Sequence, residues 1–377
     1  MDVFSELIGQ ERVVETLRRA VSGERYAMTH AWLFVGPPGS GRSNAAKAFA
    51  AALQCPNGGC GACEQCRTVR SGAHPDVTLV STEKLSIGVG EARDLVGRAN
   101  MAPVQGKYQI VVVEDADRAT ERAADALLKG LEEPAPHTLW LLCAPTPDDV
   151  IITIRSRCRL VKLTTPSEEA VAQLLERRDG VPAALAAHAA HISQGHVGRA
   201  RALARSEDAR IRRHEVLTIP GKLRTLSDCL AAADNLVKAA TAEADELADR
   251  LDKQEMAELE TNLGYSGKGS KPRHMAAAVK SLEEQQKLRH KRMVRDALDR
   301  TLSEFTALFR DVLVLQTNAD AALVNADIAD VSRKLAQQRT PEETIRVLDA
   351  ILDTRARLEG NVAPLLAFES LLISIRG

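Results

Sequence analysis

Aromatic residues are scarce in this chain of 377 residues, at 3% of the sequence. Hydrophobic residues still make up 45%, so the core must come mainly from aliphatic and alanine side chains, a composition that favours helices and close packing. A strong net charge is absent as well, because 50 basic residues face 51 acidic ones. This balance excludes a global basic field for nucleic acid, so any DNA contact would need a local patch or partner proteins.

Long hydrophobic runs are missing too. The longest ones, at 110–113 and 139–144, are far too short to cross a bilayer. The N-terminus lacks the basic start and the apolar stretch of a secretory signal. We therefore expect a cytoplasmic protein without a membrane partner. In that compartment the seven cysteines are expected to be metal ligands or core residues rather than disulfides.

Short apolar segments alternate with helical ones in the first part of the chain. An amphipathic helix is predicted from Val3 to Ser22. Further on, strands are predicted at 31–35, 77–80, 109–114, 138–144 and 159–163, with helices at 43–53, 90–100 and 122–132. This alternation predicts a parallel sheet covered by helices on both faces.

Strand signals end after Pro166, where Ser167 is a plausible N-cap of a helix. The length allows two or three domains. We predict an α/β domain at 1–165 with a four-cysteine module at 55–66, a small helical domain at 166–205 and a helical domain at 206–377. Within the last, the glycine-rich basic stretch Gly264 to His274 is predicted to be a loop between two long helices.

Residues 36–43, GPPGSGRS, have the spacing of a phosphate-binding loop, G-x-x-x-x-G-K-[ST], with arginine at the lysine position. The segment lies between an apolar strand and an alanine-rich helix, the setting that such a loop requires. Glycine lets the backbone approach a phosphate, the helix N-terminus attracts it, and a serine hydroxyl can ligate Mg²⁺. The pattern predicts a nucleotide-type site at Gly36, Gly39, Gly41, Arg42 and Ser43.

Two departures argue against efficient hydrolysis at this loop. Lysine is a compact charge and guanidinium a wide planar fork, so Arg42 is expected to displace a γ-phosphate or to swing outward. Glu114 and Asp115 end a strand in the order Glu-Asp, whereas hydrolysing enzymes usually have Asp-Glu, and Asp115 is one methylene short for activating water. A simpler role for these acids is to cap the next helix. The loop is compatible with a bound anion or nucleotide (ATP or ADP with Mg²⁺) and with an empty site.

Four cysteines lie within a short glycine-rich stretch, at Cys55, Cys60, Cys63 and Cys66. Their C-x4-C-x2-C-x2-C spacing suits a compact tetrahedral all-thiolate site for Zn²⁺. Four thiolates leave no open coordination position, so this ion would be structural. An iron–sulfur cluster is the competing interpretation. The other three cysteines, Cys143, Cys158 and Cys229, are predicted to be core residues.

Three further motifs accompany the loop and the cysteines: His74-Pro75-Asp76, residues 123–134 with AADALLKGLEEP, and Ser156-Arg157-Cys158. Together these features resemble the clamp-loader subunits of bacterial DNA polymerase III, AAA+ proteins with an AANALLKTLEEP segment and an SRC motif. The resemblance is strong over about residues 5 to 205 and general in character beyond. Asp125 and Gly130 depart from the usual Asn and Thr of that segment.

The resemblance implies an α/β AAA+ (P-loop) domain with a zinc insertion, a small helical lid and an all-α collar domain for oligomerisation. It also implies partners at the replisome: gamma/tau and delta subunits, and through the complex the beta sliding clamp and primed DNA. The departures at Arg42, Glu114 and Asp115 fit a member that hydrolyses little itself. In residues 195–200, GHVGRA, a glycine stands at the sensor-arginine position of the motor subunit unless the register slips by one, which fits the same member.

By the same resemblance, Arg157 would be an arginine finger acting in trans, reaching the γ-phosphate of ATP on a neighbouring gamma/tau subunit. Such fingers contribute about 10³–10⁵ in rate. Ser156 and Cys158 flank it in the motif, and Arg155 is a weaker rival. The simpler alternative for Arg157 is a surface ion pair.

Two other functions compete with this one. The chain could be a slow AAA+ ATPase of the gamma/tau type, or mainly a DNA-binding module. The latter would use a basic run that is more simply explained as one solvated helix face; its residues are Lys287, Arg289, His290, Lys291, Arg292 and Arg295.

Overall fold

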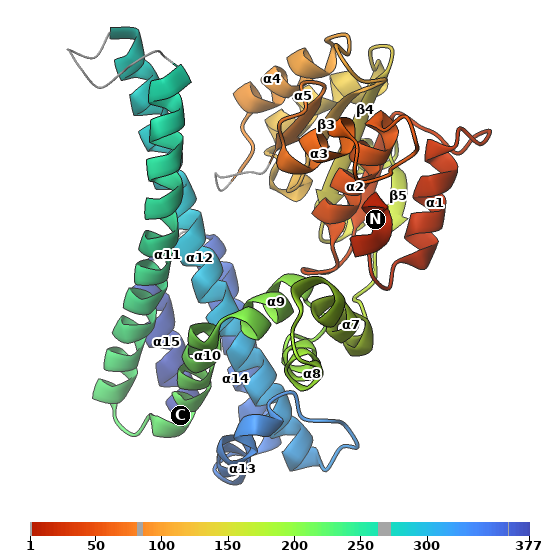
Figure 1. Cartoon of the computed structure of the whole chain (residues 1–377). Helices are drawn as coiled ribbons and strands as arrows, with labels where there is room; N and C mark the ends of the chain where they lie inside the picture. Colours follow the sequence, from red (N-terminus) through yellow and green to blue (C-terminus); the bar gives the residue numbers. More distant parts are fainter. Residues whose placement is uncertain (1, 81–85, 263–272, 361) are drawn as a thin grey trace. The chain divides into compact units, whose positions relative to one another are not determined.

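A computed structural model of the protein describes residues 2–80, 86–262, 273–360 and 362–377 (Figure 1). The chain divides into two compact units, Met1–Arg205 and Ser206–Gly377. In the described residues, no helix combines the length and the apolar character that crossing a membrane requires.

The first unit is built on a parallel sheet of five strands in the order β2-β3-β4-β1-β5 (Figure 1). The strands agree with the segments predicted from apolar runs, which confirms the α/β fold class. Their bounds are β1 Ala31–Val35, β2 Val77–Val80, β3 Gln109–Val113, β4 Thr138–Ala144 and β5 Arg159–Lys162.

Helices cover both faces of this sheet, as the continuous burial of the central strands requires. Alternate residues of β1 enter two different cores: Trp32 packs with Phe49 on one face, and Leu33 belongs to the core of the other. The helices of this part are η1 Val3–Glu6, α1 Glu11–Val21, α2 Arg42–Gln54, α3 Glu64–Ser71, α4 Val89–Ala99, η2 Ala116–Arg118, α5 Glu121–Glu132, η3 Pro147–Asp149 and α6 Ile152–Arg155.

The helix expected from Val3 to Ser22 is wrong in its first part. The structure has a short η1 and then α1, separated by a turn that contains Gly9 with φ +67°. A left-handed residue cannot continue a right-handed helix, and glycine adopts this conformation at low cost.

Trp140 of β4 lies against α5 at a glycine. Its indole nitrogen donates a hydrogen bond of 3.2 Å to the Gly130 carbonyl. A Cβ added at Gly130 would stand 3.0 Å from Cζ2 of Trp140 and 3.3 Å from Val96. The missing side chain therefore makes room for the buried tryptophan.

Three helices complete the first unit: α7 Glu168–Asp179, α8 Ala183–Ile192 and α9 Val197–Arg205. Ser167 is the N-cap of α7, because its hydroxyl accepts a hydrogen bond from the Ala170 amide at 3.2 Å, as predicted.

The second unit is helical throughout its described residues. Its core contains Phe305, Phe309 and Phe368, all fully buried. Most of the stretch Gly264 to His274, predicted as a loop, lies outside the described residues. The elements are α10 Glu207–Thr218, η4 Pro220–Lys222, α11 Leu226–Asn262, α12 Arg273–Thr317, η5 Ala326–Ile328, α13 Ala329–Gln337, α14 Pro341–Glu359 and α15 Pro364–Arg376.

Candidate functional site

The phosphate loop connects β1 to α2 and has the backbone that its glycines predict. Gly39 and Gly41 have φ of +83° and +91°, a region that favours glycine. Gly41 is the N-cap of α2, and no side chain caps this helix terminus. Ser43 lies in the first turn of α2 and is half-buried. The amides at the start of the helix are therefore placed as in an anion site.

Arg42 bends back onto the loop. One of its guanidinium nitrogens donates a hydrogen bond of 2.6 Å to the carbonyl of Gly36, the first glycine of the motif. From the sequence, Arg42 was expected either to displace a γ-phosphate or to swing outward. The structure does not show the outward swing. To contact a phosphate, the guanidinium would have to give up its hydrogen bond to the Gly36 carbonyl.

The acidic residues after β3 face cations from their own chain. Glu114 forms an ion pair with Lys47 of α2, with 2.6 Å between Oε1 of Glu114 and Nζ of Lys47. Asp115 lies 4.0 Å from Arg118. Burial raises the pKa of Asp117, and the Asp115 charge adds to this effect. The charge of Glu114 is therefore neutralised by the Lys47 ammonium.

Sequence reasoning missed Lys47. A signal was available, because Lys47 is the single charged residue between Arg42 and the end of α2. Its side chain is 34% exposed, whereas its neighbours Ala46 and Ala48 are buried. A lone cation in an otherwise apolar helix beside a phosphate loop needs a partner, and here that partner is Glu114.

His196, from the turn before α9, lies against the loop. A Cβ added at Gly39 would collide with its ring. Its Nδ1 accepts a hydrogen bond of 3.2 Å from the Arg199 amide, and burial lowers its pKa. His196 belongs to the segment 195–200, GHVGRA, in which a glycine next to Arg199 was expected at the sensor-arginine position, so an imidazole of this segment contacts the loop.

The four predicted cysteine ligands come together. The sulfur atoms of Cys55, Cys60, Cys63 and Cys66 all lie within 4.8 Å of one another, and Cys55 is 3.7 Å from both Cys60 and Cys63. A zinc–sulfur bond of about 2.3 Å gives a tetrahedron with edges of about 3.8 Å, so this spacing fits zinc. A disulfide would need about 2.0 Å between sulfurs.

The protein environment also favours thiolates at this cluster. Burial opposes ionisation of Cys55, but backbone amides, that of Cys60 first, outweigh it and lower its pKa to about 6. Amides of Ala62 and Cys63 likewise lower the pKa of Cys60. Burial raises the pKa of Cys66, so a bound cation would have to stabilise that thiolate.

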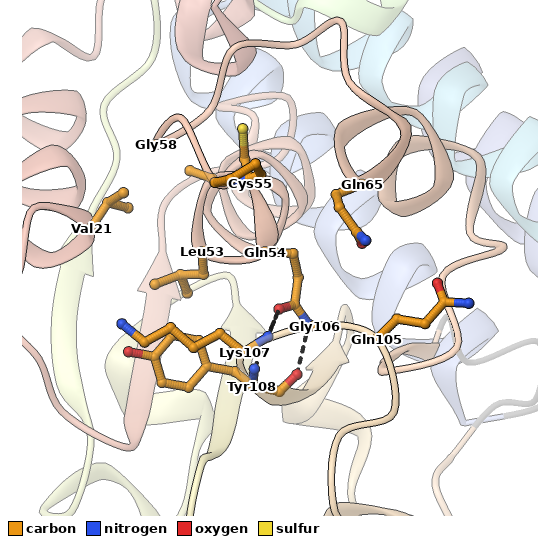
Figure 2. A pocket seen from close by; sticks show the side chains of 12 residues that line it. Val21, Leu53, Gln54, Cys55, Gly58, Gln65, Gln105, Gly106, Lys107 and Tyr108 are labelled. Atoms are coloured by element: carbon orange, nitrogen blue, oxygen red, sulfur yellow. Dashed lines mark hydrogen bonds between the residues drawn. The ribbon is translucent and has the colours of Figure 1, made fainter.

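A pocket of about 490 Å³ adjoins the cysteine module (Figure 2). Gln54, the last residue of α2, forms one wall and binds the opposite segment: it accepts hydrogen bonds from the amides of Lys107 and Tyr108 and donates one to the Tyr108 carbonyl (Figure 2). Cys55 and Gln65 line the same pocket. These contacts tie the module to the start of β3.

The His74-Pro75-Asp76 motif supports the same segment. Asp76 accepts hydrogen bonds from the amides of Val104, Gln105 and Gly106 at 2.6–2.8 Å. The His74 ring contacts the Gln65 side chain and accepts a bond of 3.0 Å from the Asp76 amide. The motif is thus structural within this chain.

Arg157 lies just after α6, with its side chain 37% exposed. It forms an ion pair of 2.6 Å with Glu132 at the end of α5 and donates a hydrogen bond of 2.8 Å to the Thr153 carbonyl. Arg155 pairs with Asp148 instead. Arg157 is therefore accessible, but in this chain it already has an acidic partner that the sequence did not reveal.

Two residues of the basic run on α12 pair with acids of α11, which packs beside it (Figure 1). Arg289 pairs with Asp252 and Glu255, and His290 contacts Asp245 at 2.7 Å. These acids reduce the local positive charge, which argues against a DNA site. The run is not one fully solvated face either, because the Arg289 side chain is only 12% exposed.

A five-stranded parallel sheet with a phosphate loop after β1, acids after β3 and a four-cysteine module defines an AAA+ P-loop protein. A family model described as "DNA polymerase III, delta subunit" matches residues 9–167, and one described as "DNA polymerase III, delta subunit, C terminal" matches 279–377. The chain belongs to the clamp-loader subunits of DNA polymerase III, as the resemblance predicted.

Similar proteins include two kinds of subunit. The chain is 37% identical to the gamma/tau subunit of Mycobacterium tuberculosis over 41% of its own length and 27% of that protein. It is 32% identical to the delta' subunit of Bacillus subtilis over 46% of its own length and 53% of that one. The chain thus matches only a quarter to a half of these relatives. A gamma subunit-related protein of Thermotoga maritima superposes with a TM-score of 0.41 and 16% identity, covering 96% of this chain and 98% of that one.

Proposed function

We propose that this chain is a delta-prime subunit of the DNA polymerase III clamp loader. In this role it hydrolyses little ATP itself and supplies Arg157 in trans to a neighbouring gamma/tau ATPase. With the delta subunit, the complex would load the beta sliding clamp on primed DNA in the cytoplasm.

Weak hydrolysis is supported by the charges at its own loop. Lys47 pairs with Glu114, the acid expected near the metal, and Arg42 is bonded to Gly36. A carboxylate occupied by an ammonium is a poor partner for hydrated Mg²⁺, and the Arg42 guanidinium would first have to give up its bond to Gly36 before it could contact a γ-phosphate.

The exposure of Arg157 is the observation that carries the proposal. Its side chain is not sealed within its own unit, and its ion pair with Glu132 is partly exposed. Such pairs contribute only about 0–1 kcal/mol, so the guanidinium can exchange Glu132 for a phosphate at low cost. A γ-phosphoryl group that gains charge in the transition state is the stronger partner.

A reconstituted ring of this chain with gamma/tau and delta tests the proposal. Arg157→Ala should silence the one ATP site beside this chain, because a finger contributes about 10³–10⁵ in rate there. Arg155→Ala is the matched control, since it removes a neighbouring arginine that pairs with Asp148. DNA-dependent ATP turnover unaffected by Arg157→Ala would refute the trans role.

A gamma/tau-type ATPase is the second candidate, favoured by the identity to the mycobacterial gamma/tau subunit. Purified chain alone separates the two. Turnover that survives Arg42→Lys and disappears with Ser43→Ala would support the ATPase, because the hydroxyl is the Mg²⁺ ligand in such loops. The delta-prime proposal expects negligible turnover in both.

The four-cysteine module is proposed to hold one structural Zn²⁺ through Cys55, Cys60, Cys63 and Cys66. The sulfur spacing supports this, and all four positions of a tetrahedral ion would be filled.

A further inference from the structure

The phosphate loop has the backbone of an anion site, and the acids beside it, Glu114 and Asp115, face cations of the same chain. In a magnesium-dependent loop, the acid after β3 orients the hydrated ion and a lysine contacts the phosphates. Here the acid contacts a lysine, and the lysine position of the motif holds Arg42. The question is which ligand this distribution of charge suits.

Magnesium fits the residues poorly. The Nζ of Lys47 stands 2.6 Å from Glu114, whose side chain is only 19% exposed. A divalent ion at the same carboxylate would lie within a few ångströms of the ammonium and be repelled by it. Mg²⁺ also requires nearly octahedral oxygen ligands, and the Glu114 carboxylate that would face its waters is already paired with an ammonium.

A phosphate group does fit. The N-terminus of α2 has no capping side chain, and Gly39 and Gly41 have the positive φ that lets loop amides converge. Ser40, within the loop, is 4% exposed, and its hydroxyl has no hydrogen-bond partner. The Ser40 hydroxyl oxygen lies on the side of the loop where Gly36 stands: a Cβ added at Gly36 would be 2.7 Å from it.

The cations beside the loop can serve the ligand directly. Arg42 needs only to exchange the Gly36 carbonyl for a phosphate oxygen, which makes a stronger, charge-assisted hydrogen bond. Lys47 meanwhile keeps Glu114 from repelling an anion.

We propose that the loop binds the diphosphate group of a nucleotide, or free pyrophosphate, without a divalent cation. Lys47 takes the place of Mg²⁺ as the positive charge that neutralises Glu114. This inference goes beyond the proposed function, because the site needs no neighbouring subunit and no hydrolysis.

Calorimetric titration of the full chain with ADP, in EDTA and in excess Mg²⁺, tests the proposal. Wild-type affinity in EDTA should equal or exceed that in Mg²⁺. Lys47→Ala should weaken binding in EDTA about tenfold, the scale of one lost charge-assisted interaction, and Mg²⁺ should restore it. Lys238→Ala is the matched control, since it removes a lysine that pairs with an aspartate at 2.7 Å on α11.

Glu114→Gln protects the test against a misfolded lysine variant. It leaves Lys47 charged, so ADP affinity should be kept or raised both in EDTA and in excess Mg²⁺, whereas a magnesium-dependent loop would lose affinity in Mg²⁺. Pyrophosphate should displace ADP, which identifies the diphosphate as the recognised group. Magnesium-dependent binding by the wild type, failure of pyrophosphate to compete, or no ADP binding at all would each overturn the proposal. None of these results depends on the ring assay for Arg157.

Discussion

At the scale of single residues, Asp76 shows how a buried charge holds a loop. It is 1% exposed, and three backbone amides, those of Val104, Gln105 and Gly106, donate to its carboxylate. Burial alone would raise its pKa, but the three amides outweigh burial and lower it. The ionised form therefore stabilises the folded state.

Asp76→Asn should lower the free energy of unfolding by about 1–3 kcal/mol, because the amide group accepts fewer hydrogen bonds and leaves buried donors unpaired. Urea unfolding measures this, with the exposed Asp125→Asn as the control. Since the folded pKa lies below the unfolded one, the contribution of Asp76 is present above the unfolded pKa and is lost as the pH falls through the folded pKa. The difference between wild type and variant should therefore shrink in acid, and a difference independent of pH would contradict this account.

Glu132 is predicted to restrain Arg157 in the free chain. Glu132→Gln removes the charge that pairs with the guanidinium at 2.6 Å, so more of the arginine is available to a neighbour. We expect ATP turnover in the reconstituted ring to rise by up to about fivefold, the equivalent of a partly exposed ion pair. Arg157→Ala should remove the gain, and a gain that persists in the double variant would show that Glu132 acts by another route.

Most of the candidate residues were found from the spacing of residues within a short stretch of sequence. Contacts between distant stretches could not be predicted from such spacing. The cysteine ligands and the loop glycines each lie in one short stretch, so the sequence was enough to predict them. The partners Glu114 of Lys47 and Glu132 of Arg157 lie far away in sequence. They meet only because of how the sheet orders its strands and helices.

At the scale of elements, periodicity and apolar runs predicted the sheet because its central strands are continuously buried. The turn before α1 was missed, since Gly9 lies in an apolar pattern that reads equally well as helix. The cysteine module combines core packing with a local cap: Cys66 and Val69 of α3 are fully buried in the core on one face of the sheet, and the Cys63 sulfur caps the N-terminus of this short helix.

Metal content tests this module. Elemental analysis should find one zinc per chain, and Cys66→Ser should abolish stoichiometric binding, because one of four thiolates is lost. Cys229→Ala, which alters a buried cysteine of α11 outside the cluster, should leave the zinc in place. Iron with the absorption of a cluster would instead support the iron–sulfur alternative.

At the scale of the whole molecule, the chain has separate cores in its two compact units. Separate cores allow separate cooperative transitions. We expect calorimetry to resolve two, and chelation of zinc to affect only the transition of the unit that carries the cysteines. A loss of about 3 kcal/mol there would lower its midpoint by roughly 6–12 °C. One transition that shifts as a whole would show that the units unfold together.

The contact between Gly130 and Trp140 has a consequence for how such chains diverge. The threonine usual at position 130 of the related segment would press its Cβ against the indole, which has no free space around it. A side chain at position 130 and the tryptophan at position 140 can coexist only if one of their neighbours gives by a few tenths of an ångström, so the choice of residue at one site constrains the other. Comparison of homologues should show the pair inherited jointly, and a chain with both bulky residues would need its α5 displaced from the sheet.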